Sequence, residues 1–281
     1  MIVGGCDLGS TTGKAAILID DQLFCGDIIT ATTKPALTAT LAMDSAIQKA
    51  GLKSIADLEA IVGTGYGRLK VPFATDNVSE ISCHGRGAFW ACPTVRTIID
   101  IGGQDCKAIS LNDKGGVTQF EMNERCAAGT GRFFQVMAKV LTCGLEGIGS
   151  TANISANPVS ISNQCSVFAE SEVITLINEE KPLPDIITGI NKAVANRVSS
   201  LVRRVGVTND VTLTGGCSKN EGLVQALENL LGVTFKRLPV DPQSIGAIGA
   251  AVIAREKRQI QLAKAVSATP QAASATPQLG A

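Results

Sequence analysis

Two short polar turns with the same order of residue types stand in the first half of the sequence. One is Asp7-Leu-Gly-Ser-Thr-Thr-Gly-Lys14 and the other is Asp100-Ile-Gly-Gly-Gln-Asp105. Glycines in such turns let backbone N–H groups approach phosphate oxygens, and a nearby aspartate can hold Mg²⁺, usually through water. The first turn is not a Walker A loop, because its glycine spacing is wrong and Lys14 leads into a predicted strand. The pair therefore predicts a nucleotide-phosphate site of another kind.

The residue types suggest how the two turns divide the chemistry. Asp7 and Asp100 are the expected carboxylates for Mg²⁺, held through water. Gly102 and Gly103 are expected to close over the phosphates from the second turn, and Gln104 is the neutral side chain best placed to orient an attacking water. The expected phosphate contacts from the first turn are Ser10, Thr11, Thr12, Gly13 and Lys14.

A third glycine turn, Thr214-Gly-Gly-Cys217, follows a predicted strand at 211–213 and precedes a predicted helix at 221–231. A late turn of this kind can support the adenosine of a nucleotide. The expected contacts there are Gly215, Gly216 and Cys217, together with Gln243 and Gly246 at the start of the final predicted helix.

A cysteine, Cys126, stands on a small-residue loop just before an apolar-periodic segment. The periodicity predicts a helix that begins near Thr130. A thiolate at a helix N-terminus faces the positive end of the helix dipole and unpaired N–H groups. The stretch suits an anionic metal cluster, but by itself it also fits a buried thiol.

The elements that must position these turns occur in duplicate. Each Asp-x-Gly turn lies between two predicted strands, and five residues of the first copy recur at a constant offset: Asp7, Gly9, Lys14, Ala15 and Asp20 match Asp100, Gly102, Lys107, Ala108 and Asp113. This predicts an internal duplication whose halves face each other across a cleft. We expect one unit at 1–94, a second unit with the cysteines at 95–243, and a final helix at 244–260 that packs back on the first.

Composition narrows the possible functions. The chain has 281 residues with 25 basic and 25 acidic side chains, a balance that argues against nucleic-acid and membrane-surface binding. It has no run of about 18 apolar residues and no signal-peptide pattern, so we expect a cytoplasmic protein. Its nine cysteines, with no Cys-x-x-Cys, are then reduced thiols or metal ligands. The repeated Ser-Ala-Thr-Pro-Gln near the end predicts a disordered tail at 261–281.

Several segments carry a family resemblance. Within the superfamily of acetate kinase, sugar kinases, Hsp70 and actin, the chain resembles the 2-hydroxyacyl-CoA dehydratase activators from about Ile2 to Ala254. The segments that carry this resemblance are Thr64-Gly-Tyr-Gly-Arg68, Glu80-Ile-Ser-Cys-His84, Asp100–Asp105, Cys126-Ala-Ala-Gly-Thr-Gly-Arg-Phe133 and Cys165-Ser-Val-Phe-Ala-Glu-Ser-Glu172. The resemblance implies an α/β fold with two duplicated ribonuclease-H-like domains around a nucleotide cleft. The ATP-binding subunits of benzoyl-CoA reductase are relatives of this family.

The resemblance also implies cofactors and partners. It implies a homodimer with one oxygen-sensitive 4Fe–4S cluster at its two-fold axis, to which each chain supplies Cys126 and Cys165. Four cysteines usually hold such a cluster, and two per chain suffice across a two-fold interface. Hydrolysis of ATP to ADP, with Mg²⁺, would drive single-electron transfer from reduced ferredoxin or flavodoxin to a partner dehydratase or related CoA-thioester reductase.

Two other functions remain open at this point. One is a small-molecule kinase of the same superfamily, although the short inserts between the duplicated motifs leave little room for its substrate. The other is a nucleotide-sensing regulator whose cysteines are structural, and both would give a colourless protein. We interpret His84, the single histidine, as structural. A basic helical stripe is interpreted as a solvated face: Lys192, Arg197, Arg203 and Arg204.

Overall fold

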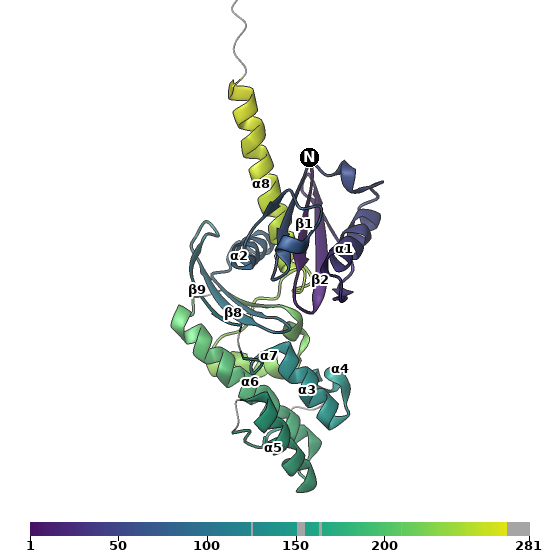
Figure 1. The fold of residues 1–281 in the computed structure, drawn as a ribbon. Coiled ribbons are helices and arrows are strands. Elements are labelled where there is room, and N and C mark those ends of the chain that lie inside the picture. Colours follow the sequence, from purple (N-terminus) through teal and green to yellow (C-terminus); the bar gives the residue numbers. More distant parts are fainter. Residues whose placement is uncertain (125, 151–154, 163–164, 209, 269–281) are drawn as a thin grey trace, which may run out of the picture.

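The computed structural model describes residues 1–124, 126–150, 155–162, 165–208 and 210–268. Two β-sheets of similar plan lie one above the other, with helices between them and on their outer faces (Figure 1). Buried apolar side chains form a core on each face of the first sheet and on the far face of the second. No helix in the described ranges is long and apolar enough to cross a membrane.

The first sheet is centred on β1 (Ile2–Leu8) and has the strand order β3-β2-β1-β5-β6, with β4 also paired to β2. Strand β1 runs antiparallel to β2 and parallel to β5. The other strands are β2 (Thr12–Ile19), β3 (Gln22–Cys25), β4 (Ile29–Thr30), β5 (Ala60–Thr64) and β6 (Asp76–Asn77). Between β3 and β4 the chain bends at Gly26, where a Cβ would lie only 2.8 Å from the Ala42 carbonyl oxygen.

The second sheet repeats this plan in the order β10-β7-β8-β9. Its strands are β7 (Thr97–Ile101), β8 (Cys106–Leu111), β9 (Val117–Asn123) and β10 (Val211–Thr214). Strand β7 runs antiparallel to β8 and parallel to β10, as β1 does to β2 and β5. Register repeats as well, since Asp7 pairs with Lys14 and Asp100 with Lys107. The predicted duplication is confirmed.

Helices fill the spaces around the two sheets. The outer face of the first sheet is covered by α1 (Pro35–Lys49). Between the sheets lie α2 (Glu80–Ala91) and α8 (Ile245–Ala268), whose apolar side chains pack with residues of both sheets. The far face of the second sheet is covered by α3 (Gly131–Leu141), α6 (Leu183–Val205) and α7 (Glu221–Leu231).

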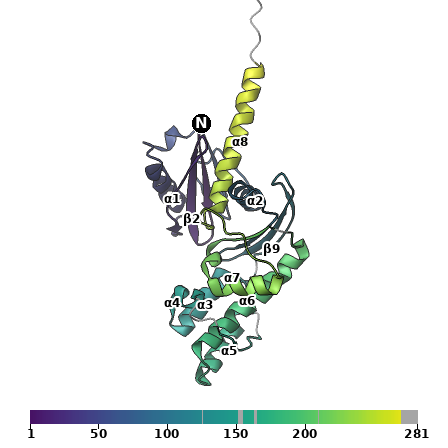
Figure 2. The ribbon, with the colours of Figure 1, turned by 180° about the vertical axis from the view of Figure 1, so that it is seen from behind.

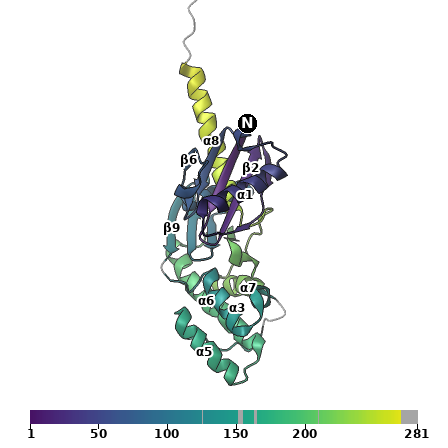
Figure 3. The same cartoon turned by 45° about the vertical axis from the view of Figure 1, so that its right-hand side comes forward.

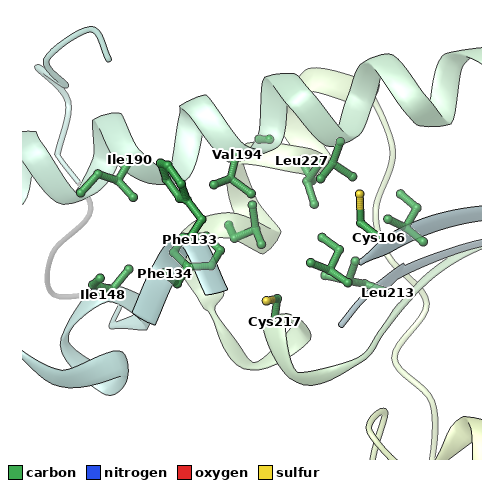
Figure 4. Close-up of a cluster of buried hydrophobic side chains, with 14 of the residues drawn as sticks. Cys106, Phe133, Phe134, Ile148, Ile190, Val194, Leu213, Cys217 and Leu227 are labelled. Carbon is green, nitrogen blue, oxygen red and sulfur yellow. The ribbon is translucent and has the colours of Figure 1, made fainter. Parts of the chain in front are cut away.

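Two free cysteines are buried in the apolar core of the second half. Cys106 on β8 and Cys217 after β10 point in among Phe134, Leu213 and Leu227 (Figure 4). Burial raises the pKa of Cys106 to about 11 and that of Cys217 to about 12. Both thiols therefore stay protonated at neutral pH.

The final helix corrects one prediction from the sequence. Helix α8 does not end near residue 260 but continues to Ala268, because residues 261–265 are strong helix formers. Its middle is tied to the first half by ion pairs of Arg255 with Asp21, Lys257 with Asp76 and Arg258 with Glu59. Beyond them the helix projects from the molecule (Figure 2). Residues 269–281 of the expected tail lie outside the described residues.

Candidate nucleotide and cluster site

A cavity of about 630 Å³ lies between the two halves. Its wall is built by both Asp-x-Gly turns, the Thr214–Gly–Gly turn, and the segment from α3 into α4 (Gly144–Gly149). The predicted residues that line it are Asp7, Ser10, Thr11, Thr12, Lys14, Asp100, Gly102, Gly103, Gly215, Gly216, Cys217 and Gln243. The three turns that the sequence singled out therefore line one cavity.

Three predicted residues lie close to this cavity but not on its wall. Gly246 packs behind Asp7, where a Cβ would lie 2.7 Å from Asp7 Oδ2. Gly13 packs on Thr38 of α1, again too closely for a Cβ. Gln104 is exposed on the β7–β8 turn and is not among the lining residues. Its role in orienting water stays a prediction, one that requires this turn to move inward.

The two turns form duplicated half-sites. Asp7 Oδ2 lies 3.2 Å from Lys14 Nζ, and Asp100 Oδ2 lies 3.3 Å from Lys107 Nζ. A glycine with positive φ also lies against each aspartate. Gly65 (φ +87°) follows β5 and lies against Asp7, and Gly215 (φ +82°) follows β10 and lies against Asp100. Because a Cβ at either position would crowd the aspartate, only glycine leaves room for the carboxylates where they are.

The second half-site carries far more charge than the first. Lys107 is buried, and its Nζ lies 2.8 Å from Asp105 Oδ2 and 3.6 Å from Glu80 Oε2, besides the contact with Asp100. Burial alone would lower the pKa of Lys107, but the surrounding carboxylates raise it above its usual value. Lys14 contacts Asp7 alone among the acidic side chains of the described chain, which leaves its other N–H groups for a phosphate.

His84 contacts this charged cluster, where the sequence predicted only a structural role. Its Nε2 lies 3.3 Å from Asp100 Oδ1, and its Nδ1 lies 3.0 Å from the Glu80 carbonyl oxygen. Burial would lower the pKa of His84, but the Asp100 carboxylate outweighs it and raises that pKa to about 9. Conversely, burial would raise the pKa of Asp100, whereas His84 and Lys107 hold it well below its usual value.

The remaining wall of the cavity was not predicted from the sequence. Beyond the Gly215–Cys217 turn it is made by Leu145 and Ile148 of α4, by Phe134 of α3, and by Asn220. These apolar and polar groups surround the region where a base and ribose would lie if the phosphates sat at the two aspartates. Helix α4, which carries Leu145 and Ile148, is short and glycine-rich, and its sequence has no clear helical periodicity.

Helix α3 is hydrogen-bonded directly to the second phosphate turn. The Gly131 N–H donates to the Gly102 carbonyl oxygen at 2.9 Å, and the Arg132 N–H donates to the Gly103 carbonyl oxygen at 2.8 Å. These are N–H groups of the first helical turn, which have no partner inside the helix. The turn that lines the cavity therefore also caps the helix that follows Cys126.

Cys126 and Cys165 both precede helices, as predicted. Cys126 is half-buried, and its carbonyl oxygen accepts a hydrogen bond from Asn123 Nδ2 at 3.0 Å. Cys165 is exposed at the start of α5 (Ser166–Asn178). No group of three or more potential metal ligands occurs in the described part of the chain. The described residues of one chain thus do not form a four-thiolate set.

The chain was compared with known proteins. A family model for the BadF/BadG/BcrA/BcrD ATPase family matches residues 5–254. The chain is 44% identical to the activator of lactoyl-CoA dehydratase of Anaerotignum propionicum, over 91% of this chain and 98% of that protein. It is 42% identical to the (R)-2-hydroxyglutaryl-CoA dehydratase activating ATPase of Acidaminococcus fermentans, over 90% and 96%.

A solved structure agrees with these relatives. The activator of the 2-hydroxyisocaproyl-CoA dehydratase from Clostridium difficile with bound ADPNP superposes with a TM-score of 0.88 at 40% identity, over 94% of this chain and 98% of that one. The predicted fold class, duplicated ribonuclease-H-like domains of the actin, Hsp70 and sugar-kinase superfamily, is confirmed by this likeness and by the two matching sheets.

Proposed function

We propose that this chain, which belongs to the BadF/BadG/BcrA/BcrD ATPase family, is an ATP-driven activator of a 2-hydroxyacyl-CoA dehydratase or a related CoA-thioester reductase. In this proposal it passes single electrons to that partner from a 4Fe–4S cluster shared by two copies of the chain. The dehydratase activators to which it is similar support the activator role.

ATP binding is supported by the cavity and its three glycine turns. Lys14 and the N–H groups around Gly9–Thr12 would bind the phosphates from the first half, and Gly102 and Gly103 from the second. The apolar side chains of α4 and the Gly215–Cys217 turn would hold the adenosine. Asp7 and Asp100 are hard oxygen donors of the kind Mg²⁺ takes, and the ion would neutralise phosphate charge during hydrolysis.

The observation that carries the proposal is the capping of α3 by the phosphate turn. Gly131 lies five positions after Cys126 and donates its N–H to Gly102, which lines the nucleotide cavity. A movement of this turn on ATP binding or hydrolysis would pull on the start of α3 and so on the loop that carries Cys126. ATP can shift that equilibrium only by binding one arrangement more tightly than the other.

The two cysteines fit a shared iron–sulfur cluster. A bound 4Fe–4S cluster would store and release one electron without breaking a bond. Both thiols are accessible, in contrast to the buried Cys6, Cys83, Cys106 and Cys217. Cys165 is the N-cap of α5, and Cys126 stands on the loop that leads into α3. The positive end of α5 would stabilise an anionic cluster at Cys165 by roughly 0.3–2 kcal/mol.

A homodimer is supported by the surface of α5. Four large apolar side chains on this helix are exposed, namely Val167, Phe168, Ile174 and Ile177. The helix lies at the end of the molecule remote from the first sheet (Figure 3). Several large apolar side chains exposed on one short helix favour a contact with another protein, and Cys165 directly precedes this helix. A two-fold contact through α5 would bring two copies of Cys165 together.

The test is anaerobic purification and iron–sulfur reconstitution of the wild type and of three variants. We expect a brown wild-type dimer with about four irons, and no cluster in Cys126→Ala or Cys165→Ala. Both variants should still bind ATP, because neither cysteine lines the cavity. Cys92→Ala is the matched control, since Cys92 is equally a partly buried free thiol but lies at the end of α2, and it should keep its cluster.

Iron-free wild-type protein after reconstitution would exclude electron transfer and favour the kinase or the regulator. A cluster that survives either the Cys126 or the Cys165 substitution would show that the ligand assignment is wrong. Reduced ferredoxin or flavodoxin is the proposed electron donor, and ATP-dependent activation of a dehydratase is the final assay.

A further inference from the structure

A second cavity of about 640 Å³ opens between α6 and the second sheet, away from the nucleotide. It is an open groove that shares no lining residue with the nucleotide cavity. We call it the α6 groove. Its lining residues are Cys106, Met122, Asn123, Asn196, Arg197, Ser199, Ser200, Leu201, Arg203, Arg204 and Leu230.

The α6 groove is strongly positive. Three of its side chains are guanidinium groups, those of Arg197, Arg203 and Arg204, and no carboxylate occurs among its described lining residues. At the surface, Arg204 Nε lies 3.7 Å from Glu121 Oε2. The basic stripe of α6, which the sequence predicted to be a solvated face, has two parts. Lys192 is exposed outside the groove, whereas the three arginines line it.

The groove touches the loop that carries Cys126. Asn123 lines the groove and also donates from Nδ2 to the carbonyl oxygens of Cys126, at 3.0 Å, and Ala128, at 3.4 Å. From the other side, Gly129 packs on the side chain of Arg197, whose Cγ would lie 3.1 Å from a Cβ at that glycine. An acidic surface seated in the groove would thus lie directly beside Cys126.

We propose that the α6 groove is the docking site for the electron donor, a small redox protein with an acidic surface. This inference rests on the proposed function. The donor loads the cluster before the ATP-driven step, so its site should be usable whatever nucleotide is bound, and the α6 groove is separate from the nucleotide cavity. In the transfer, the reduced donor loses one electron and the oxidised cluster gains it, with no bond or proton exchanged.

The test uses the reconstituted holoprotein and two reductants, dithionite and a reduced acidic 4Fe–4S ferredoxin. Arg203→Glu/Arg204→Glu should weaken binding of oxidised ferredoxin, measured by titration calorimetry, and slow cluster reduction by reduced ferredoxin, each by about tenfold or more. Reduction by dithionite, which needs no docking site, should be unchanged. Wild-type ferredoxin binding should weaken steeply with salt. Lys192→Glu, a charge reversal of one residue on the same helix but outside the groove, should behave as the wild type.

Several outcomes would overturn the inference. Equal ferredoxin binding in the double variant and the wild type would do so, as would an equal loss in Lys192→Glu. A double variant that loses only electron delivery to the dehydratase would assign the groove to the acceptor instead. A change in its dimer mass would make the groove an interface between chains. If the double variant misfolds, Arg203→Gln/Arg204→Gln should show an intermediate loss, and no loss there counts against docking. A cluster-free wild type refutes the proposed function itself.

Discussion

At the scale of single residues, the two duplicated aspartates differ in how many partners they have. Asp100 accepts from Thr214 Oγ1 at 2.8 Å, contacts His84 and pairs with Lys107. Asp7 pairs only with Lys14 in the described chain, and the hydroxyl of Thr64, the counterpart of Thr214, has no hydrogen-bond partner there. Asp7 therefore keeps more free lone pairs, and of the two it is better suited to hold the water shell of Mg²⁺.

The raised pKa of His84 predicts a pH dependence of stability in nucleotide-free, metal-free protein. The folded pKa of about 9 lies above the ordinary value of 6.5, so the stabilisation is complete below pH 6.5 and is lost as pH rises through 9. Urea unfolding should show a loss of up to about 3 kcal/mol across this range. His84→Asn should remove that loss. An unchanged pH profile in the variant would contradict the pairing with Asp100.

A second residue-scale prediction concerns Gly65. Gly65→Ala should weaken binding of Mg²⁺ and ATP about tenfold or more, because its methyl group would collide with Asp7 Oδ1 and Mg²⁺ depends on carboxylate position. Titration calorimetry with a non-hydrolysable ATP analogue measures this. The control is Gly232→Ala, which has a similar φ of +68° but open space around its Cβ. It should cost about 1–2 kcal/mol of stability and leave ATP affinity unchanged.

How far the sequence predicted these residues depended on local pattern. The strand–turn–strand repeats stand out in the sequence, so Asp7, Lys14 and Asp100 could be found. His84 could be named but not placed, because α2 contains Gly85 and Gly87, which are poor helix formers. Gly87 is required by tertiary packing, since a Cβ there would collide with the Ile245 carbonyl oxygen of α8. Only the assembled fold shows that α2 brings His84 to Asp100.

At the scale of elements, α3 connects the Gly102–Gly103 turn of the cavity with the loop that carries Cys126. Its N-cap Thr130 is extended (φ −129°, ψ 169°), and its Oγ1 donates to the Ala127 carbonyl oxygen at 2.7 Å, which ties the helix start to the Cys126 loop. The first helical N–H groups are tied to Gly102 and Gly103 instead. The sequence predicted where this helix begins, but the partner of its first turn lies some thirty positions earlier in the chain and no local pattern reports it.

Gly131→Pro tests this link. Proline suits the first helical position, and the extended Thr130 can precede it. Its ring Cδ replaces the hydrogen that is donated to the Gly102 carbonyl oxygen, so the bond is lost and the two groups must separate. We expect the variant to bind ATP and the cluster but to lose the effect of nucleotide on the cluster. The measurement is the rate at which a chelator removes iron in the presence of the ATP analogue and of ADP.

Gly131→Ala is the matched control, because it adds a Cβ at the same place but keeps the N–H. The two nucleotides should give rates that differ by about fivefold or more in the wild type and in the alanine variant. The same difference in the proline variant would show that the coupling runs by another route.

At the scale of the whole molecule, the proposed dimer depends on the exposed apolar side chains of α5. Phe168→Glu should convert the dimer to a monomer and prevent cluster assembly, because Phe168 is 63% exposed beside Cys165. Analytical ultracentrifugation and iron content measure both effects. Ile260→Glu on the projecting part of α8 is the control, since Ile260 is 55% exposed but remote from α5. Dissociation by the control alone would move the interface to α8.

The bonds between the Gly102–Gly103 turn and α3 have a consequence that involves no movement. The Gly102 carbonyl and the Gly103 N–H belong to one peptide group, whose oxygen accepts from Gly131. An anion placed against that N–H polarises the whole peptide, which makes its oxygen a stronger acceptor, by about 10–30% per bond in such chains. A nucleotide phosphate at the Gly103 N–H would therefore strengthen the hydrogen bond between the Gly102 oxygen and the first turn of α3 without moving any atom.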